Sequence, residues 1–90
     1  MYFFVKVRVD VHKMAAFGQK LQSGAITTHP LSTYCLEDDP SIGLNIWEAE
    51  DLAGFEKAFL PHREFYSEII EVAPVITSQE AMKALMSQMR

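Results

Sequence analysis

A chain of 90 residues has room for one hydrophobic core, which excludes a second domain and predicts a single domain over residues 1–90. Hydrophobic residues make up 49% of the chain and aromatic residues 11%, which excludes a disordered protein. Eight basic residues stand against 12 acidic ones, a formal net charge of −4, and no basic stripe follows the chain, so we expect no nucleic-acid partner.

The surroundings of the protein are indicated by the same composition. Cys35 is the only cysteine, which excludes an internal disulfide and fits a reducing compartment. No apolar run approaches ~18 residues, so we expect no membrane span. The first residues lack the order of a signal peptide. We therefore expect a cytoplasmic protein.

Residues 2–9 alternate strictly in polarity, which predicts a β-strand. One face of this strand is uniformly apolar and consists of Phe3, Val5, Val7 and Val9. The other face mixes aromatic and basic groups and consists of Tyr2, Phe4, Lys6 and Arg8. The clean apolar face is expected to pack against helices.

A first helix is predicted after this strand. Asp10 is a suitable N-cap, Met14, Phe17 and Leu21 recur at helical spacing, and Gly24 is a suitable stop.

Two strand-like runs, 31–37 and 42–48, flank the turn residues 38–41 and predict a β-hairpin. In the second run Ile42, Leu44 and Ile46 share one face, whereas Gly43, Asn45 and Trp47 share the other.

The second half of the chain predicts two more helices and one more strand. Asp51 caps a helix that we expect Pro61 to end. Residues 65–75, rich in Ile and Val, predict the last strand. Residues 77–80 form a capping box before a third helix. The apolar stripe of this helix consists of Met82, Leu85, Met86 and Met89.

The element order predicts an α+β fold of ferredoxin-like βαββαβ type with an additional C-terminal helix. Right-handed crossovers interleave the two strand–helix–strand units into one four-stranded antiparallel sheet with spatial order 4-1-3-2 and helices on one face. The other face is then open. We expect it to carry a set of large apolar side chains, namely Tyr2, Phe4, Tyr34, Leu36 and Trp47. So much apolar surface predicts a homodimer in which two open faces pack together.

Three segments of the sequence resemble the dimeric α/β-barrel superfamily: residues 1–7, residues 46–51 and residues 65–76 with their Glu-Val-Ala-Pro-Val core. The likeness is closest to short microbial proteins of unknown function, and more distant to muconolactone isomerase-like and antibiotic-biosynthesis-monooxygenase-like proteins. The resemblance implies a sheet-to-sheet dimer with a cavity between sheet and helices or between the sheets. It implies no activity, and no muconolactone isomerase-like catalytic set matches this sequence.

Lys6 and Arg8 are the sharpest site candidates, because both point from a central strand into the face that a dimer would cover. Two readings stay open. Arg8 pairs with Glu68 or with the partner subunit, since an unpaired buried charge is costly. Alternatively, both cations hold a small anionic ligand such as a carboxylate or phenolate, whose apolar body lies on Phe4, Tyr34 and Trp47.

Polar residues gather at one end of the predicted sheet. They comprise Asp10, His12, Glu37, Asp38, Asp39, His62, Arg63 and Glu64. Their spacing matches no metal-site motif, so we expect solvated turns and no metal or cofactor. Cys35 is expected to be a packed structural thiol.

The sequence therefore predicts a homodimer that binds a small anionic or aromatic molecule in a cavity at the sheet. One alternative is a cofactor-free isomerase or monooxygenase acting on an aromatic or lactone-like substrate, with His62, Tyr66 or Glu68 as acid/base and Arg8 as anion clamp. Another is a structural or regulatory interaction module that needs no pocket.

Overall fold

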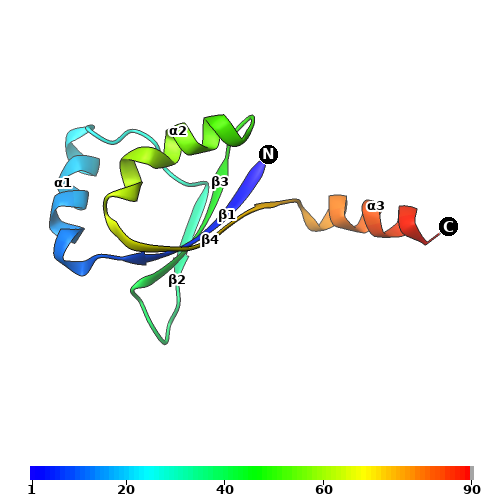
Figure 1. Ribbon diagram of the computed structural model, residues 1–90, viewed down its shortest axis with the longest axis horizontal. Coiled ribbons are helices and arrows are strands. Elements are labelled where there is room, and N and C mark those ends of the chain that lie inside the picture. The colour runs from blue at the N-terminus through cyan, green and yellow to red at the C-terminus, as the bar shows by residue number, and fades with distance from the viewer. Residues whose placement is uncertain (90) are drawn as a thin grey trace.

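The computed structural model describes residues 1–89 of the chain (Figure 1). Its elements are β1 (Tyr2–Val9), the 3-10 helix η1 (Val11–Lys13), α1 (Met14–Ser23), β2 (Ser32–Cys35), β3 (Ile42–Glu48), α2 (Leu52–Arg63), β4 (Tyr66–Val75) and α3 (Ser78–Gln88). The fold is α+β, with one four-stranded sheet and three α-helices.

All neighbouring strands of the sheet run antiparallel, in the order β2-β3-β1-β4, which from the β4 edge reads 4-1-3-2. The two edge strands differ in regularity. The pairing of β4 with β1 shifts register twice, between Lys6 and Val7 and again between Arg8 and Val9. In addition, β4 contains Pro74, which has no N–H to donate.

The alternation of β1 sets the two faces of the sheet. Phe3, Val5 and Val7 are almost fully buried beneath the helices, as their apolar pattern predicts. Trp47 lies opposite Phe3 in the β1–β3 register, and directly opposed residues share a face. The prediction that Trp47 lies on the open face is therefore wrong: Gly43, Asn45 and Trp47 point toward the helices.

The core lies between this covered face and α2. Its buried members are Phe3, Val5, Val7, Trp47, Phe55 and Phe59. Phe55 stacks on Phe3 with ring centroids 4.6 Å apart, and Trp47 meets Phe59 edge-on at 5.7 Å. The small residue at position 43 matters here, because a Cβ on Gly43 would lie 3.3 Å from a methyl group of Val7.

Two helix N-termini follow the predicted capping chemistry, whereas Asp10 caps the 3-10 helix η1 and α1 begins after Lys13 without a side-chain cap. Asp51 accepts a hydrogen bond from the backbone N–H of Gly54 at 2.8 Å, and Thr77 accepts one from Glu80 at 3.1 Å. Gly24, with φ +80°, ends α1 in the left-handed region. One prediction is wrong: α2 does not end at Pro61 but continues to Arg63. Proline is tolerated there because it lies in the last turn, where few further helical bonds depend on it.

The third helix stands apart from the rest of the chain. It follows β4 outward, past the edge of the body, and has no buried residue (Figure 1). This projection makes the molecule 53 Å long but only 31 Å and 18 Å in its other dimensions.

Candidate functional site

A cavity of about 260 Å³ lies between α1 and the covered face of the sheet, and we refer to it as the α1 cavity. Its walls combine side chains of α1, all of the strands and the loop before β4, namely Val7, Val9, Met14, Phe17, Thr33, Cys35, Gly43, Asn45, Phe65 and Tyr66. These side chains include no carboxylate, histidine, lysine or arginine. The α1 cavity is therefore mostly apolar, with a few polar groups.

The polar groups of the α1 cavity are connected to one another. The hydroxyl of Thr33 donates to the side-chain carbonyl of the buried Asn45 at 2.6 Å. Burial raises the pKa of the Tyr66 phenol above its usual value, and a hydrogen bond with Asn45 opposes that rise. Tyr66 is therefore a neutral phenol at physiological pH. It is held in place by stacking on Phe59, with ring centroids 5.8 Å apart.

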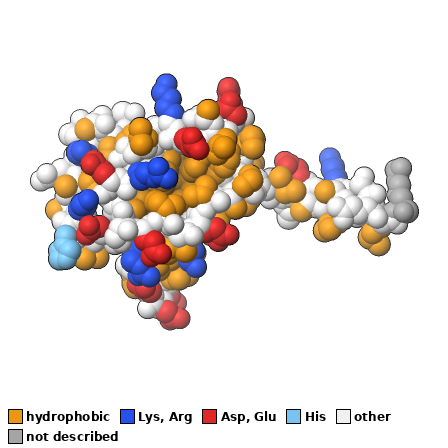
Figure 2. All heavy atoms as spheres, in the orientation of Figure 1, with side chains coloured by type: hydrophobic (Ala, Val, Ile, Leu, Met, Phe, Trp, Pro, Cys, Tyr) orange, Lys and Arg blue, Asp and Glu red, His pale blue; other side chains and the backbone are white. Residues whose placement is uncertain are grey.

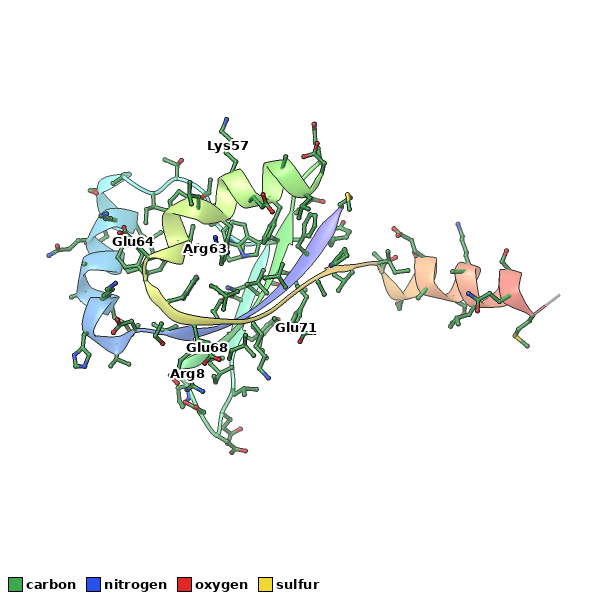
Figure 3. The ribbon with its side chains drawn as sticks, viewed as in Figure 1. Arg8, Lys57, Arg63, Glu64, Glu68 and Glu71 are labelled. Atoms are coloured by element: carbon green, nitrogen blue, oxygen red, sulfur yellow. The ribbon has the colours of Figure 1, made fainter. Side chains whose placement is uncertain are left out.

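Arg8 lies on the other face of the sheet and is already paired. Its guanidinium is 3.2 Å from Asp39 and 3.6 Å from Glu68, and it donates to the hydroxyl of Ser41 at 3.0 Å (Figure 3). These contacts lower the pKa of Asp39, through the hydrogen bond from the Ser41 hydroxyl first and that from Arg8 second. Of the two readings of Arg8, the structure shows the ion pair with Glu68.

Lys6 lies one step further along the open face, directly opposite Leu44 on β3 and Glu71 on β4. Phe4 and Tyr34 share this face: Phe4 lies opposite Ile46, and Tyr34 opposite Leu44. The structure thus brings together four of the five proposed ligand-binding residues. The fifth, Trp47, lies on the covered face, because its position pairs with Phe3.

The weak catalytic candidates are not assembled into one site. Tyr66 lines the α1 cavity, whereas Glu68 pairs with Arg8 on the opposite face of the sheet. His62 was expected to lie in a solvated turn. It is instead a buried residue of α2. Its Nε2 donates to the carbonyl of Thr28 at 2.7 Å, because a carbonyl oxygen only accepts. His62 therefore ties the loop before β2 to α2.

The environment of His62 predicts a pH-dependent stability. Burial lowers its pKa below the usual 6.5, the bond to Thr28 opposes this, and the charge of His29 adds to the lowering. As the pH falls below about 6.5, the unfolded chain takes up a proton that the folded chain still refuses, so the free energy of unfolding decreases. We expect His62→Gln to remove this part of the loss between about pH 7 and pH 5 in urea unfolding.

The exposed His29 is the matched control, and His29→Gln should keep most of the pH dependence of the unaltered chain. Equal losses of stability in the unaltered chain and His62→Gln over this range would contradict the assignment.

Two of the polar residues at the end of the sheet pair with different groups. Asp10 accepts from the backbone N–H of His12 at 3.0 Å, and Glu64 pairs with Lys20 at 2.9 Å. Across residues 1–89, no group of three or more His, Cys, Asp and Glu side chains is placed to hold a metal ion.

Two features of the α1 cavity were missed by the sequence reading. Asn45 was grouped with the open face, and Cys35 was expected to be packed, whereas it is exposed at the cavity mouth. The available signal for Asn45 was its place on the same strand face as Gly43 and Trp47. A polar side chain on a covered face needs a hydrogen-bond partner, which would have indicated a polar contact there.

Comparisons with protein-family models, with curated proteins and with solved structures find no match. Among the helices of residues 1–89, none is long and apolar enough to cross a membrane.

Proposed function

We propose that this protein binds a small, uncharged aromatic molecule in the α1 cavity. One observation carries the proposal: an apolar hollow between α1 and the sheet is lined by the hydrogen-bonded pair Thr33 and Asn45 and by the phenol of Tyr66. Binding sites for small molecules commonly combine mostly apolar walls with a few polar groups that orient the ligand.

The size of the α1 cavity supports a ligand with a single ring. A cavity of roughly 150 Å³ suffices to hold benzene. At about 260 Å³, the α1 cavity has room for one ring with a short substituent. A hydroxyl or carbonyl on that substituent would meet Tyr66 and Asn45.

The charges favour the aromatic over the anionic ligand of our two expectations. No cationic side chain lines the α1 cavity, and Arg8 is occupied by Asp39 and Glu68 on the other face. An anion in the cavity would lose its hydration without a compensating cation. Arg8, the anion clamp of the isomerase or monooxygenase alternative, lies on the other face of the sheet from the α1 cavity, which likewise favours binding over that alternative.

Phenol and toluene, titrated separately and followed by NMR chemical shifts of the cavity residues, test this function. Both probes should bind, phenol more tightly. Tyr66→Phe should weaken phenol binding by about 2–10-fold, the effect of one hydrogen bond, and leave toluene binding unchanged. Cys35→Phe should abolish the binding of both probes, because the larger ring occupies the cavity.

Tyr34→Phe is the control, since Tyr34 lies beside Cys35 in β2 but faces away from the cavity. Failure of both probes to shift any cavity resonance at millimolar concentration would refute the proposed function and favour a pocket-free interaction module.

We further propose that the fold is ferredoxin-like and that two copies pack open face to open face. The βαββαβ order of elements supports the first part. The central apolar residues Phe4, Leu44 and Ile46 on a face that no helix covers support the second. Lys6 and Glu71 lie opposite each other on this face. If an interface buried this face, the two opposite charges would be buried as a pair and neither would be left uncompensated.

A further inference from the structure

The third helix exposes a complete apolar stripe. Met82, Leu85, Met86 and Met89 recur at helical spacing and are between 60% and 84% exposed. A helix with one apolar face gains its stability in a protein by burying that face. The stripe of α3 is therefore expected to be buried against another surface, although it is exposed within its own copy.

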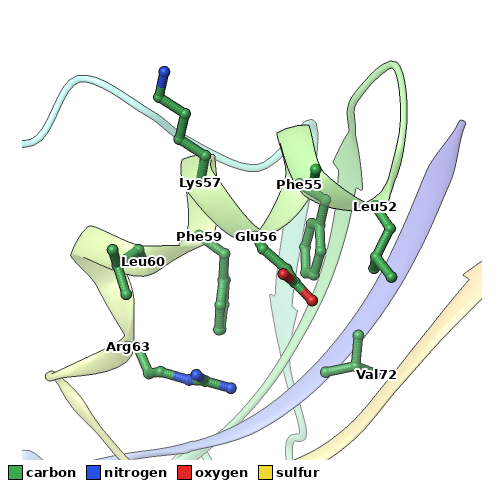
Figure 4. Close-up of a pocket in the computed structure, with 9 residues that line it drawn as sticks. Leu52, Phe55, Glu56, Lys57, Phe59, Leu60, Arg63 and Val72 are labelled. Carbon is green, nitrogen blue, oxygen red and sulfur yellow. The ribbon is translucent and has the colours of Figure 1, made fainter.

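The body carries an apolar groove, the α2–β4 groove. It has a volume of about 630 Å³ and lies between one side of α2 and the edge strand β4. Figure 2 shows hydrophobic side chains gathered over this region and along one side of the projecting helix. The apolar lining consists of Leu52, Phe55, Phe59, Leu60 and Val72 (Figure 4). Of these, Leu52 and Leu60 are 54% and 64% exposed.

One pair of opposite charges, Glu56 of the groove and Lys83 of α3, can match across the two surfaces. Glu56 and Arg63 are directed into the groove, whereas Lys57 points away from it (Figure 4). At 100° per residue, Lys83 borders the apolar stripe of α3. Over residues 1–89 the ion pairs are Arg8–Asp39, Arg8–Glu68 and Lys20–Glu64, so Glu56 and Lys83 form none among these residues. Docking of α3 along the groove would bring Lys83 to Glu56.

We infer that α3 of one copy packs into the α2–β4 groove of a second copy, with Lys83 beside Glu56. The inference rests on the proposed homodimer but uses a different surface from the open face. The structure favours the second copy over the same chain, because only Ile76 separates the end of β4 at Val75 from the N-cap Thr77. A hinge this short favours exchange of the helix between copies.

The contact adds to the open-face interface of the proposed dimer. One face of the 11-residue arm, with the four stripe residues and Lys83, would meet the nine residues that line the groove, which is less than the roughly 20–30 residues a side of a standard protein–protein complex. In a two-fold dimer each copy gives one arm and receives one, so the contact forms twice.

Cysteine cross-linking of the full chain tests the inference directly. In a Cys35→Ser background, one tagged chain carries Met86→Cys and an untagged chain carries Leu60→Cys. Mixing and mild oxidation should give a cross-linked heterodimer on a non-reducing gel. Gln22→Cys, on the exposed surface of α1, replaces Leu60→Cys as the control and should give none. A third chain carries both Met86→Cys and Leu60→Cys. The inference would be overturned if no heterodimer is cross-linked, whether or not this third chain forms a cross-link within itself.

A charge exchange supplies a second, independent readout. Lys83→Glu and Glu56→Lys should each raise the dimer dissociation constant about fivefold, and the double variant should restore it. Additive weakening in the double variant would overturn the pairing.

Ile46→Lys, on the open face, separates the two proposals. If this variant dissociates the dimer while the cross-linking and the charge exchange both fail, the face-to-face dimer is supported and the arm contact is refuted.

Discussion

Trp47→Ala is expected to lower the free energy of unfolding by about 3–5 kcal/mol. The side chain is 2% exposed and meets Phe55, Phe59 and His62 edge-on, with centroids 6.2, 5.7 and 5.0 Å away. Removing the indole leaves a cavity among rigid rings that cannot collapse into it. Domains of this size have a total stability of roughly 5–13 kcal/mol, so the variant should be marginally stable. Urea unfolding followed by far-ultraviolet circular dichroism measures the loss.

Trp47→Phe is the matched control. It keeps most of the aromatic contact and removes an indole N–H that is buried without a hydrogen-bond partner. Removing a buried donor without a partner stabilises the fold and offsets part of the packing energy that is lost. We therefore expect the free energy of unfolding to fall by only about 1 kcal/mol. If the alanine and phenylalanine variants are equally stable, Trp47 is not an anchor of the core.

Ile46→Lys is expected to raise the dimer dissociation constant at least about 100-fold. Ile46 lies on the interior strand β3, opposite Phe4 and Ser32 on the open face. If two open faces bury about 500 Å² of apolar surface per copy, the gross gain is ~12 kcal/mol per copy before the costs of association. A lysine at the centre of that surface would lose its hydration without a paired carboxylate. Sedimentation velocity across a concentration series measures the change.

Val11→Lys is the control for this experiment, because Val11 is also exposed and apolar but lies in η1, outside the sheet. It should leave the dissociation constant within about twofold. A chain that sediments as a monomer before any substitution would remove the basis of the dimer.

The sequence was sufficient for most of the architecture, because local signals agreed with one another. The alternation of β1 has one uniformly apolar side, so its covered face was predictable, and Asp51 and Thr77 cap the helices they precede. In contrast, β3 carries Ile42, Leu44 and Ile46 on one side and Trp47 on the other. Periodicity predicts that these are opposite faces but not which one the helices cover. Only the register with Phe3 decides it.

The candidate site was less predictable than the fold, because it depends on contacts between distant segments. The pairing of Arg8 with Glu68 follows from strand adjacency and was foreseen as one of two readings. The contact between His62 and the carbonyl of Thr28 spans 34 residues and leaves no local pattern. The α1 cavity likewise arises from how α1 rests over Gly43 and Asn45, which no spacing along the chain encodes.

The irregularity of β4 limits how these molecules can associate. A regular, flat edge strand invites a neighbouring chain to add its own strand, and repetition of that step gives fibrils. Two register shifts and Pro74 interrupt the row of backbone donors on β4, and at the opposite margin β2 is only four residues long. Growth by strand addition is disfavoured at both margins, which leaves side-chain surfaces as the route to a closed assembly of defined size.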